Sequence, residues 1–197
     1  MLRRFYLSND LTSLLYLQRA RVSPKVMGSI ATIILVVAIS FSAAEAQEYP
    51  LHDDVATLDG IVEAYYDVVS VRAGQAADRA RDESLHHPSA LVSITGVGGD
   101  GNPTIETMTI GGYHNLLGGP RSEGFFEWEI HRVTERFGNV ANIWSTYAHS
   151  DTEDGDAQGR GINSIQLYFD GSRWWITSWS FDSERPENPI PPQYLPN

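Results

Sequence analysis

Hydrophobic positions in the first part of the chain recur at helical spacing. Between residues 54 and 72 apolar side chains return every three or four residues, which predicts an amphipathic helix. These positions are Leu58, Ile61, Val62, Tyr65, Tyr66 and Val69. Asp53 or Asp54 can cap the first turn, and Gly74 is a stop signal. A shorter second helix is predicted over roughly 75–85.

Two further elements are predicted between this helical part and the rest of the chain. Pro88 disfavours helical geometry in the residue before it, so the second helix should end there. Residues 90–96 then predict a strand, followed by a glycine-rich loop. Thr109 can cap a short helix, although two glycines weaken that helix.

From Glu123 onward the sequence predicts strands. Two long hairpins are expected around the dipeptides Gly138-Asn139 and Asp170-Gly171, because these residues tolerate positive φ. Helices first and a meander of strands afterwards predict an α+β fold, in which the N-terminal helices pack on one face of a curved antiparallel or mixed sheet.

The two-residue turns also predict which side chains share a face of the sheet. The aliphatic face should point inward, with Ile143, Ile165, Leu167, Trp174 and Ile176. The opposite face is polar but carries four large aromatic residues: Trp144, Tyr168, Trp175 and Trp179. Exposed aromatics on a polar sheet indicate that another chain covers them, so this face predicts a homodimer interface. A three-residue loop at Asp170–Ser172 would instead exchange Trp174 and Trp175 between the faces.

The N-terminal 46 residues are typical of an export signal. An uncharged run from Val26 to Ala44 follows Lys25 and several arginines, and Ala44 and Ala46 form a small-residue cleavage site. This predicts that residues 1–46 are a signal peptide with an unusually long N-terminal extension, and that the protein is exported to the periplasm or secreted. The alternative is an uncleaved membrane anchor, since 19 apolar or small residues could just span a bilayer.

The remaining chain divides into a short linker, a domain and a tail. Residues 47–54 are the linker, 55–185 form one domain, and 186–197 are a proline-rich extended tail. The whole chain has a net charge of -11, and residues 1–46 hold five basic and only two acidic residues. The remaining residues are therefore more acidic than the whole chain, with 9 basic and 23 acidic residues. So acidic a domain repels phosphate backbones, which disfavours nucleic-acid binding. The absence of Cys excludes disulfides, thiolate catalysis and Cys-based zinc sites.

The order of these elements resembles the nuclear transport factor 2-like superfamily, and more narrowly its SnoaL-like proteins. The resemblance covers roughly 55–195. It rests on the segments AYYDVVS, SLHHPSALVSI, FFEWEIHRVTERFGNVANIWSTY and GINSIQLYFDGSRWWITSW. It implies a cone-shaped domain whose sheet wraps around a pocket, frequent dimers through the outer sheet face, and acid or base residues inside the cone. It does not imply a reaction, because the superfamily includes both enzymes and binding modules.

Two titratable side chains are candidate acid–base residues. Asp182 lies on the predicted inner face, where an apolar pocket would raise the pKa of a carboxyl group. Its alternative is a strand-end ion pair with Arg185. His149 shares that face and could be the partner of Asp182, or could simply be solvated at the start of the acidic loop. The predicted pocket lining comprises Tyr66, Trp128, Arg132, Tyr147, Asn163, Ser178 and Ser180.

No metal site is predicted. The acidic stretch 149–159 lacks the Glu that a calcium loop requires at its twelfth position, where Ile162 stands. His86 and His87 are adjacent and point apart, so a helix-terminal, exposed pair is expected.

Three functions fit these observations. The favoured prediction is an exported, cofactor-independent domain that binds a small apolar molecule in the cone cavity. The second is a cofactor-independent isomerase, dehydratase or cyclase that uses Asp182 or His149 as its base. The third is a structural dimer domain with a filled interior.

Overall fold

The computed structural model describes residues 47–196. The predicted signal peptide or anchor over 1–46 lies outside the described residues. Within 47–196, no helix has the length and apolar character needed to cross a membrane.

The structure contains more helices and strands than the sequence predicts. The helices are α1 (His52–Ala56), α2 (Leu58–Val69), α3 (Arg79–Leu85), α4 (Ile110–Leu117) and the short 3-10 helix η1 (Pro192–Tyr194). The strands are β1 (His86–Val97), β2 (Pro103–Thr109), β3 (Phe126–Phe137), β4 (Val140–Ser150), β5 (Gly159–Phe169) and β6 (Trp174–Ser183). The predicted helix over 54–72 is therefore two helices. They are separated at Thr57, whose side chain accepts a hydrogen bond from Gly60 N and caps α2.

The strands form one six-stranded sheet in the order β2-β1-β6-β5-β4-β3. All neighbours are antiparallel except β1 and β6, which are parallel, so the sheet is mixed. This confirms the predicted α+β class. Strand β2 was not predicted. Its residues lie at an edge of the sheet and are almost all exposed, so no alternation of apolar and polar side chains marks it.

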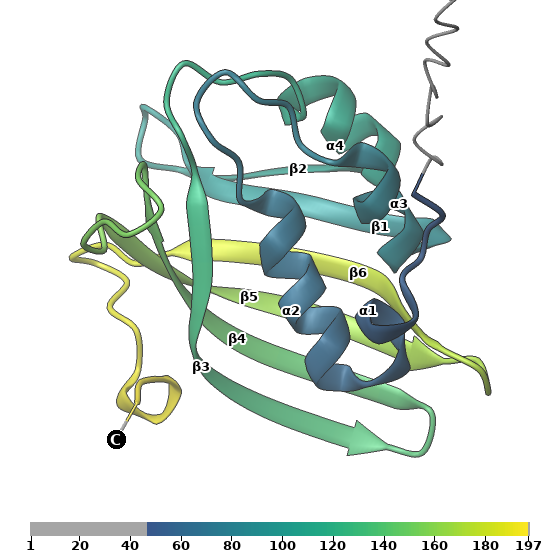
Figure 1. Ribbon diagram of the computed structural model, residues 1–197. Helices are drawn as coiled ribbons and strands as arrows, with labels where there is room; N and C mark the ends of the chain where they lie inside the picture. Colours follow the sequence, from purple (N-terminus) through teal and green to yellow (C-terminus); the bar gives the residue numbers. More distant parts are fainter. Residues whose placement is uncertain (1–46, 197) are drawn as a thin grey trace, which may run out of the picture. The chain divides into compact units, whose positions relative to one another are not determined.

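The α-helices α1 to α4 lie on one face of the sheet, and α2 crosses in front of it (Figure 1). We call the face toward α2 the inner face and the opposite one the outer face. Apolar side chains of α2 and of the inner face form the main core. Its most deeply buried members are Ile61, Val62, Leu85, Val92, Ile143, Ile165 and Ile176.

The first predicted hairpin is confirmed and the second differs. Phe137 pairs with Val140 across the two-residue turn that contains Gly138. In the second hairpin Phe169 pairs with Trp174, so the loop has four residues. The Asp170 carboxylate holds this loop by accepting hydrogen bonds from the backbone N–H groups of Ser172 and Arg173.

Two β-bulges change the faces that the hairpins predict. In β3, Glu129 pairs with Tyr147 and His131 with Thr146, which leaves Ile130 as an extra residue. In β6, Thr177 is the extra residue, between the pairs of Ile176 and Ser178. Each bulge inserts one residue into a strand with a period of two, so every side chain beyond it moves to the other face.

Gly161 in β5 allows Tyr147 to lie directly over the neighbouring backbone. A Cβ atom at Gly161 would lie 2.5 Å from Tyr147 Cζ and 2.5 Å from the Asp182 carbonyl oxygen. We expect Gly161→Ala to lower the free energy of unfolding by about 1–3 kcal/mol, because the sheet backbone must move to admit the methyl group. Urea denaturation followed by circular dichroism measures this loss.

Gly99→Ala is the matched control for this prediction. Gly99 lies in the loop before β2, and nothing lies within 4 Å of a Cβ atom built there. Equal losses of stability from the two substitutions would contradict the close packing of Tyr147 on Gly161.

Candidate functional site

The candidate site is built around Glu127, a residue that sequence reasoning did not select. Glu127 precedes the bulge in β3 and pairs with His149, so both side chains belong to the inner face. The end of α2 fixes its backbone. Glu127 N donates to Ser70 Oγ over 3.0 Å, and Ser70 Oγ also lies 2.9 Å from the Tyr66 carbonyl oxygen.

Asn163 orients the Glu127 carboxylate. The amide nitrogen of Asn163 donates to Glu127 Oε1 over 3.0 Å and to the Tyr66 hydroxyl oxygen over 3.2 Å. The Tyr65 hydroxyl donates to Asn163 Oδ1 over 3.4 Å. Asn163 is 2% exposed, so these bonds use its donors and its acceptor inside the core and fix the direction of its amide.

A second carboxylate nearby is neutralised by a guanidinium group. Arg132 Nε and Nη2 donate to Glu129, the latter over 2.7 Å, and Arg132 Nη1 donates to Asp59 over 2.7 Å. Ser145 Oγ also donates to Glu129, so it accepts from the Tyr66 hydroxyl at 2.6 Å. Glu127 makes no ion pair with any Lys, Arg or His among residues 47–196. The two carboxylates therefore lie in the same network but in different electrostatic environments.

Burial without a cationic partner raises the pKa of Glu127 to about 7, although the hydrogen bond from Asn163 acts in the opposite direction. Burial likewise raises the pKa of Tyr113 and of Tyr147 to about 12, and the negative charge of Glu127 adds to both increases. The tyrosines thus remain neutral hydroxyls at physiological pH, while Glu127 changes charge there.

A pocket of about 290 Å³ opens beside Glu127 between α2 and β3. It is lined by Val62, Glu63, Tyr66, Asp67, Glu127, Trp128, Glu129 and Arg132. The α2 residues lie one helical turn apart, so they face β3 together. Because Glu127 is only partly buried and lines this pocket, its carboxyl group is within reach of a bound molecule.

Aromatic side chains fill the region deeper than this pocket. Trp179 lies at the centre, with ring centroids 6.1 Å from Tyr65, 5.4 Å from Tyr113 and 6.3 Å from Phe181. Tyr147 packs against Phe181 at 6.5 Å. These aromatic side chains therefore leave the pocket beside α2 as the accessible space next to Glu127.

The structure brings together some of the predicted pocket residues and separates others. Arg132, Tyr147 and Asn163 belong to the inner face, as predicted, and Tyr66 of α2 faces them. Tyr66 and Arg132 line the pocket. The bulge at Ile130 moves Trp128 to the outer side, where it pairs with Ala148, although it still borders the pocket. The bulge at Thr177 moves Ser178, Ser180 and Asp182 to the outer face. The predicted inward direction of these four residues is therefore wrong.

Asp182 is held by an ion pair and does not approach the pocket beside α2. Its Oδ1 accepts from Arg185 Nη1 over 2.7 Å, and its Oδ2 accepts from Asn188 over 3.2 Å. The alternative that sequence reasoning offered for Asp182, a pair with Arg185, is confirmed. His149 does lie on the inner face and stacks on Phe125, with 5.5 Å between ring centroids. It lines a separate pocket of about 310 Å³.

The four aromatics of the predicted dimer surface have different environments. Trp144 and Tyr168 are partly exposed on the outer face. Trp175 is also outward, with its indole N–H donating to Asp170 over 2.7 Å and Arg173 stacked 3.6 Å above its ring. Trp179 is 4% exposed and belongs to the core, which corrects its assignment to the interface. The dimer itself remains a prediction.

The C-terminal segment of the same chain covers part of the outer face. The ring of Tyr194 in η1 stacks on Trp144 with 5.5 Å between centroids. Thr146 Oγ1 donates to the Tyr194 carbonyl oxygen over 2.6 Å. A cavity of about 760 Å³, which includes Trp144 and Arg185 in its wall, lies between this segment and the sheet.

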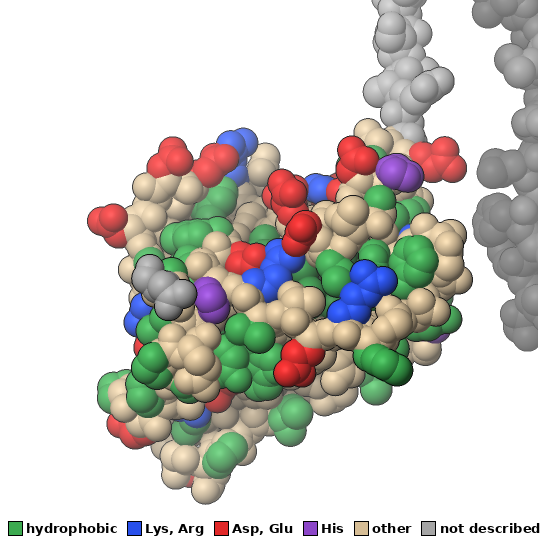
Figure 2. Space-filling model, turned by 90° about the horizontal axis from the view of Figure 1, so that it is seen from below, with side chains coloured by type: hydrophobic (Ala, Val, Ile, Leu, Met, Phe, Trp, Pro, Cys, Tyr) green, Lys and Arg blue, Asp and Glu red, His purple; other side chains and the backbone are tan. Residues whose placement is uncertain are grey.

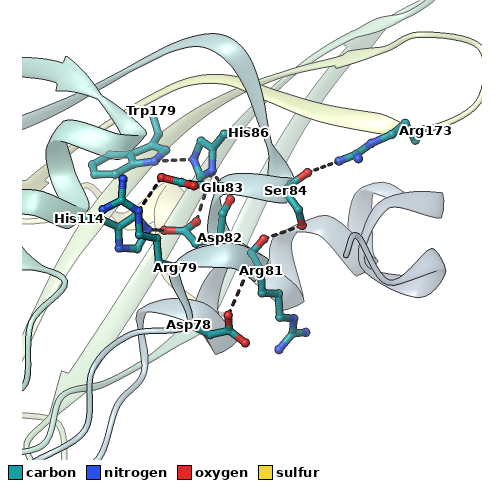
Figure 3. Close-up of polar contacts among 10 residues, drawn as sticks. All are labelled: Asp78, Arg79, Arg81, Asp82, Glu83, Ser84, His86, His114, Arg173 and Trp179. Carbon is teal, nitrogen blue, oxygen red and sulfur yellow. Dashed lines mark hydrogen bonds and ion pairs between the residues drawn. The ribbon is translucent and has the colours of Figure 1, made fainter. Parts of the chain in front are cut away.

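A buried polar cluster ties α3, α4 and β6 together (Figure 3). The Asp82 carboxylate lies between His114, which donates from Nε2 over 2.9 Å, and His86, whose Nδ1 is 3.3 Å away. The Trp179 indole N–H donates to His86 Nε2 over 3.0 Å, so His86 carries its proton on Nδ1. His86 Nδ1 donates to the backbone carbonyl oxygen of Asp82 over 2.9 Å. Burial alone would favour the neutral carboxyl group, but the hydrogen bond from His114 and the adjacent His86 imidazole outweigh it and keep the pKa of Asp82 below its usual range.

The position of His86 corrects a sequence-based expectation. His86 is 2% exposed because it begins β1 and pairs with Ile176 of the parallel strand β6. Only His87 is exposed, as predicted for both. Within the described range 47–196, no three His, Asp or Glu side chains are grouped so that they could hold a metal ion.

The surface shows how the charge is distributed around these elements. Acidic and basic side chains lie between hydrophobic ones on the face in Figure 2, and the basic side chains are scattered. No broad basic patch for a phosphate backbone is visible on this face.

No protein-family model matches the sequence, and no curated protein matches it. Solved structures do resemble it. A nuclear transport factor 2-like protein of unknown function from Shewanella baltica has a TM-score of 0.44 and 14% identity, covering 64% of this chain and 89% of its own. One from Silicibacter pomeroyi, with a similar description, has a TM-score of 0.44 and 14% identity, with coverages of 66% and 94%.

A third structure is a protein of unknown function with a cystatin-like fold from Nostoc punctiforme. Its TM-score is 0.48 at 12% identity, and the match covers 74% of this chain and 100% of that one. Similarities of this size concern fold and carry no activity, ligand or partner to this chain. The described residues form an α+β domain with a mixed six-stranded sheet. Two of these structures are described as nuclear transport factor 2-like, the superfamily that the sequence resembles.

Proposed function

We propose that this domain binds a small molecule in the pocket between α2 and β3, and that Glu127 exchanges a proton with the bound molecule. The observation that supports this proposal most directly is the position of the Glu127 carboxylate. It is partly buried, lacks a cationic partner among the described residues and borders a pocket of about 290 Å³. That volume is near the lower end of the range for small-molecule sites, so the ligand is small.

Proton transfer follows from the pKa of this group. A carboxyl group whose pKa is about 7 is partly protonated and partly ionised at physiological pH, which is the state that general acid–base catalysis requires. As a base, the carboxylate would take a proton from a carbon next to a carbonyl group and return it to the resulting enolate. This step needs no cofactor. Glu127 replaces Asp182 as the proposed base, since Asp182 is engaged by Arg185 on the outer face.

Export of the protein is also part of this proposal. We propose export on the basis of the N-terminal sequence alone. A binding domain without a reaction is the alternative, and it is favoured by the engagement of the Tyr66 hydroxyl with Ser145, which leaves no free donor there for an enolate oxygen. Both versions require a ligand against Glu127, and one experiment distinguishes them.

The test uses 4,4-dimethylcyclohexanone and its cationic analogue of the same shape, 1,1-dimethyl-4-oxopiperidinium, dissolved in D₂O. We expect at least one ketone to bind to the wild-type domain, with an affinity that changes around pH 7. Glu127→Gln should remove this pH dependence. Catalysis would appear as exchange of the α-hydrogens for deuterium, slowed by about 100-fold or more in Glu127→Gln. Proton NMR measures both binding and exchange.

Asp182→Asn is the matched control, because it removes a carboxylate from the outer face. It should leave binding and exchange as in the wild type. Binding without exchange would identify a binding domain rather than an enzyme. If neither ketone binds, or if Glu127→Gln binds them with an unchanged pH profile, the proposed function is wrong.

A further inference from the structure

The charges around the pocket beside Glu127 indicate the class of ligand that it takes. Four carboxylates line the pocket, and Arg132 is the only cation among its lining residues. Arg132 is already engaged, because it contacts Glu129 and Asp59 at 2.7 Å each. The guanidinium group is therefore not available to bind an anionic ligand.

The carboxylates other than Glu129 are weakly compensated. Glu63 is exposed and forms no ion pair among the described residues. Asp67 lies 3.3 Å from Arg81, but that guanidinium is held mainly by Asp54, at 2.8 Å and 2.9 Å. Glu127 accepts only the neutral hydrogen bond from Asn163. The pocket therefore has a negative potential that an anionic ligand would oppose and a cationic ligand would complement.

Apolar groups in the same pocket limit the kind of cation. Val62 and the ring of Tyr66 form part of its inner wall, so a strongly hydrated metal ion would be a poor match for it. An ammonium group with alkyl substituents is large and weakly hydrated, and it can contact an aromatic ring as well as carboxylates. Such a cation also provides the missing counterion for Glu127.

We propose that the pocket between α2 and β3 selects a small organic cation, such as an alkyl-substituted amine, over a neutral molecule of the same shape. This inference rests on the proposed function of the same pocket and adds the charge of its ligand. It also predicts coupling, since a cation that prefers ionised Glu127 must release the proton from this side chain when it binds.

The experiment measures dissociation constants of 1,1-dimethyl-4-oxopiperidinium and 4,4-dimethylcyclohexanone by titration calorimetry at pH 6 and pH 8. At pH 8 we expect the cation to bind about tenfold more tightly than the neutral ketone, because one attractive charge contact in a partly buried site has an energy of that order. Its affinity should rise by several-fold from pH 6 to pH 8, as Glu127 ionises. Proton release measured in two buffers of different ionisation enthalpy should accompany binding near pH 7.

Glu127→Gln should reduce the preference for the cation and abolish its pH dependence. Glu63→Gln, which changes an exposed wall of the pocket, should reduce the preference without changing the pH dependence. Asp182→Asn should change neither. Equal affinities of the wild type for the two ketones would overturn the cation preference while leaving the proposed function intact. If neither ketone binds, the proposed function fails together with the inference.

Discussion

Replacement of Trp179 with alanine is expected to lower the free energy of unfolding by about 3–5 kcal/mol, the usual cost of removing a large buried aromatic side chain. Trp179 is 4% exposed and contacts Tyr65 and Tyr113 edge-on. The substitution would also remove the hydrogen bond that its indole donates to His86. Urea denaturation followed by far-ultraviolet circular dichroism measures the loss.

Trp175→Ala is the matched control, because it removes the same side chain from the outer face of the same strand. We expect it to cost about 1–2 kcal/mol, less than Trp179→Ala, because Trp175 is half-buried and loses its hydrogen bond to Asp170 and its contact with Arg173. Trp179→Phe keeps most of the ring and tests the same site if the alanine variant does not fold. A larger loss from Trp175→Ala than from Trp179→Ala would show that the bulge in β6 has been placed incorrectly.

The second large effect concerns the dependence of stability on pH. Burial raises the pKa of Glu127 from its ordinary value of 4.5 to about 7. Between these values the folded protein holds a proton that the unfolded chain releases. The contribution of protonated Glu127 to the free energy of unfolding is therefore complete below pH 4.5. It is lost as the pH rises through 7. The loss amounts to about 3 kcal/mol for a difference of this size.

Glu127→Gln should remove this loss, because glutamine stays neutral and can still accept the hydrogen bond from Asn163. The variant should be similar to the wild type in stability at pH 5 and more stable by about 2–3 kcal/mol at pH 8. Denaturation of both proteins at several pH values measures the difference, which cancels the titration of the other acidic groups. A difference that stays constant from pH 5 to pH 8 would contradict the raised pKa.

The pattern of the sequence was sufficient to predict the class of the fold and part of the geometry of each hairpin. The turn at Gly138 and the inward direction of Ile143, Leu167, Trp174 and Ile176 are confirmed. The four-residue loop at Asp170 shifts the pairing by two residues. A shift by an even number leaves each side chain on its predicted face, which is why the inner assignment of Trp174 survives a wrong loop length.

The bulges explain why the site itself was missed. In the segment Phe126–Ile130 apolar and acidic residues alternate, so the uninterrupted alternation places Trp128 inside and the two glutamates outside. One extra residue at Ile130 reverses this arrangement. Turning Glu127 and Glu129 toward the inner face is unfavourable unless their carboxylates find partners there. It is tolerated here because Arg132 neutralises one carboxylate and Asn163, with the solvent-facing pocket, accommodates the other. Those partners are distant in sequence, so no local signal reveals them.

The aromatic residues of β6 show the same limitation. Trp175 and Trp179 are four positions apart and would share a face in a regular strand, yet Trp175 is half-buried on the outer face and Trp179 is in the core. A bulge at Thr177 has no distinctive residue type to mark it. The one local feature of Glu127 in the sequence is that an acidic residue stands beside a tryptophan near the start of β3, an edge strand of the sheet.

The stacking of Tyr194 on Trp144 means that the outer face has a competitor that is part of the same molecule. A covalently tethered segment has an effective concentration on the order of millimolar at the surface that it covers. A second chain at micromolar concentration would therefore have to overcome roughly a thousandfold disadvantage to reach Trp144. Self-association through this part of the sheet would depend on the release of the last dozen residues, so the length of the C-terminus would set the protein concentration at which it occurs.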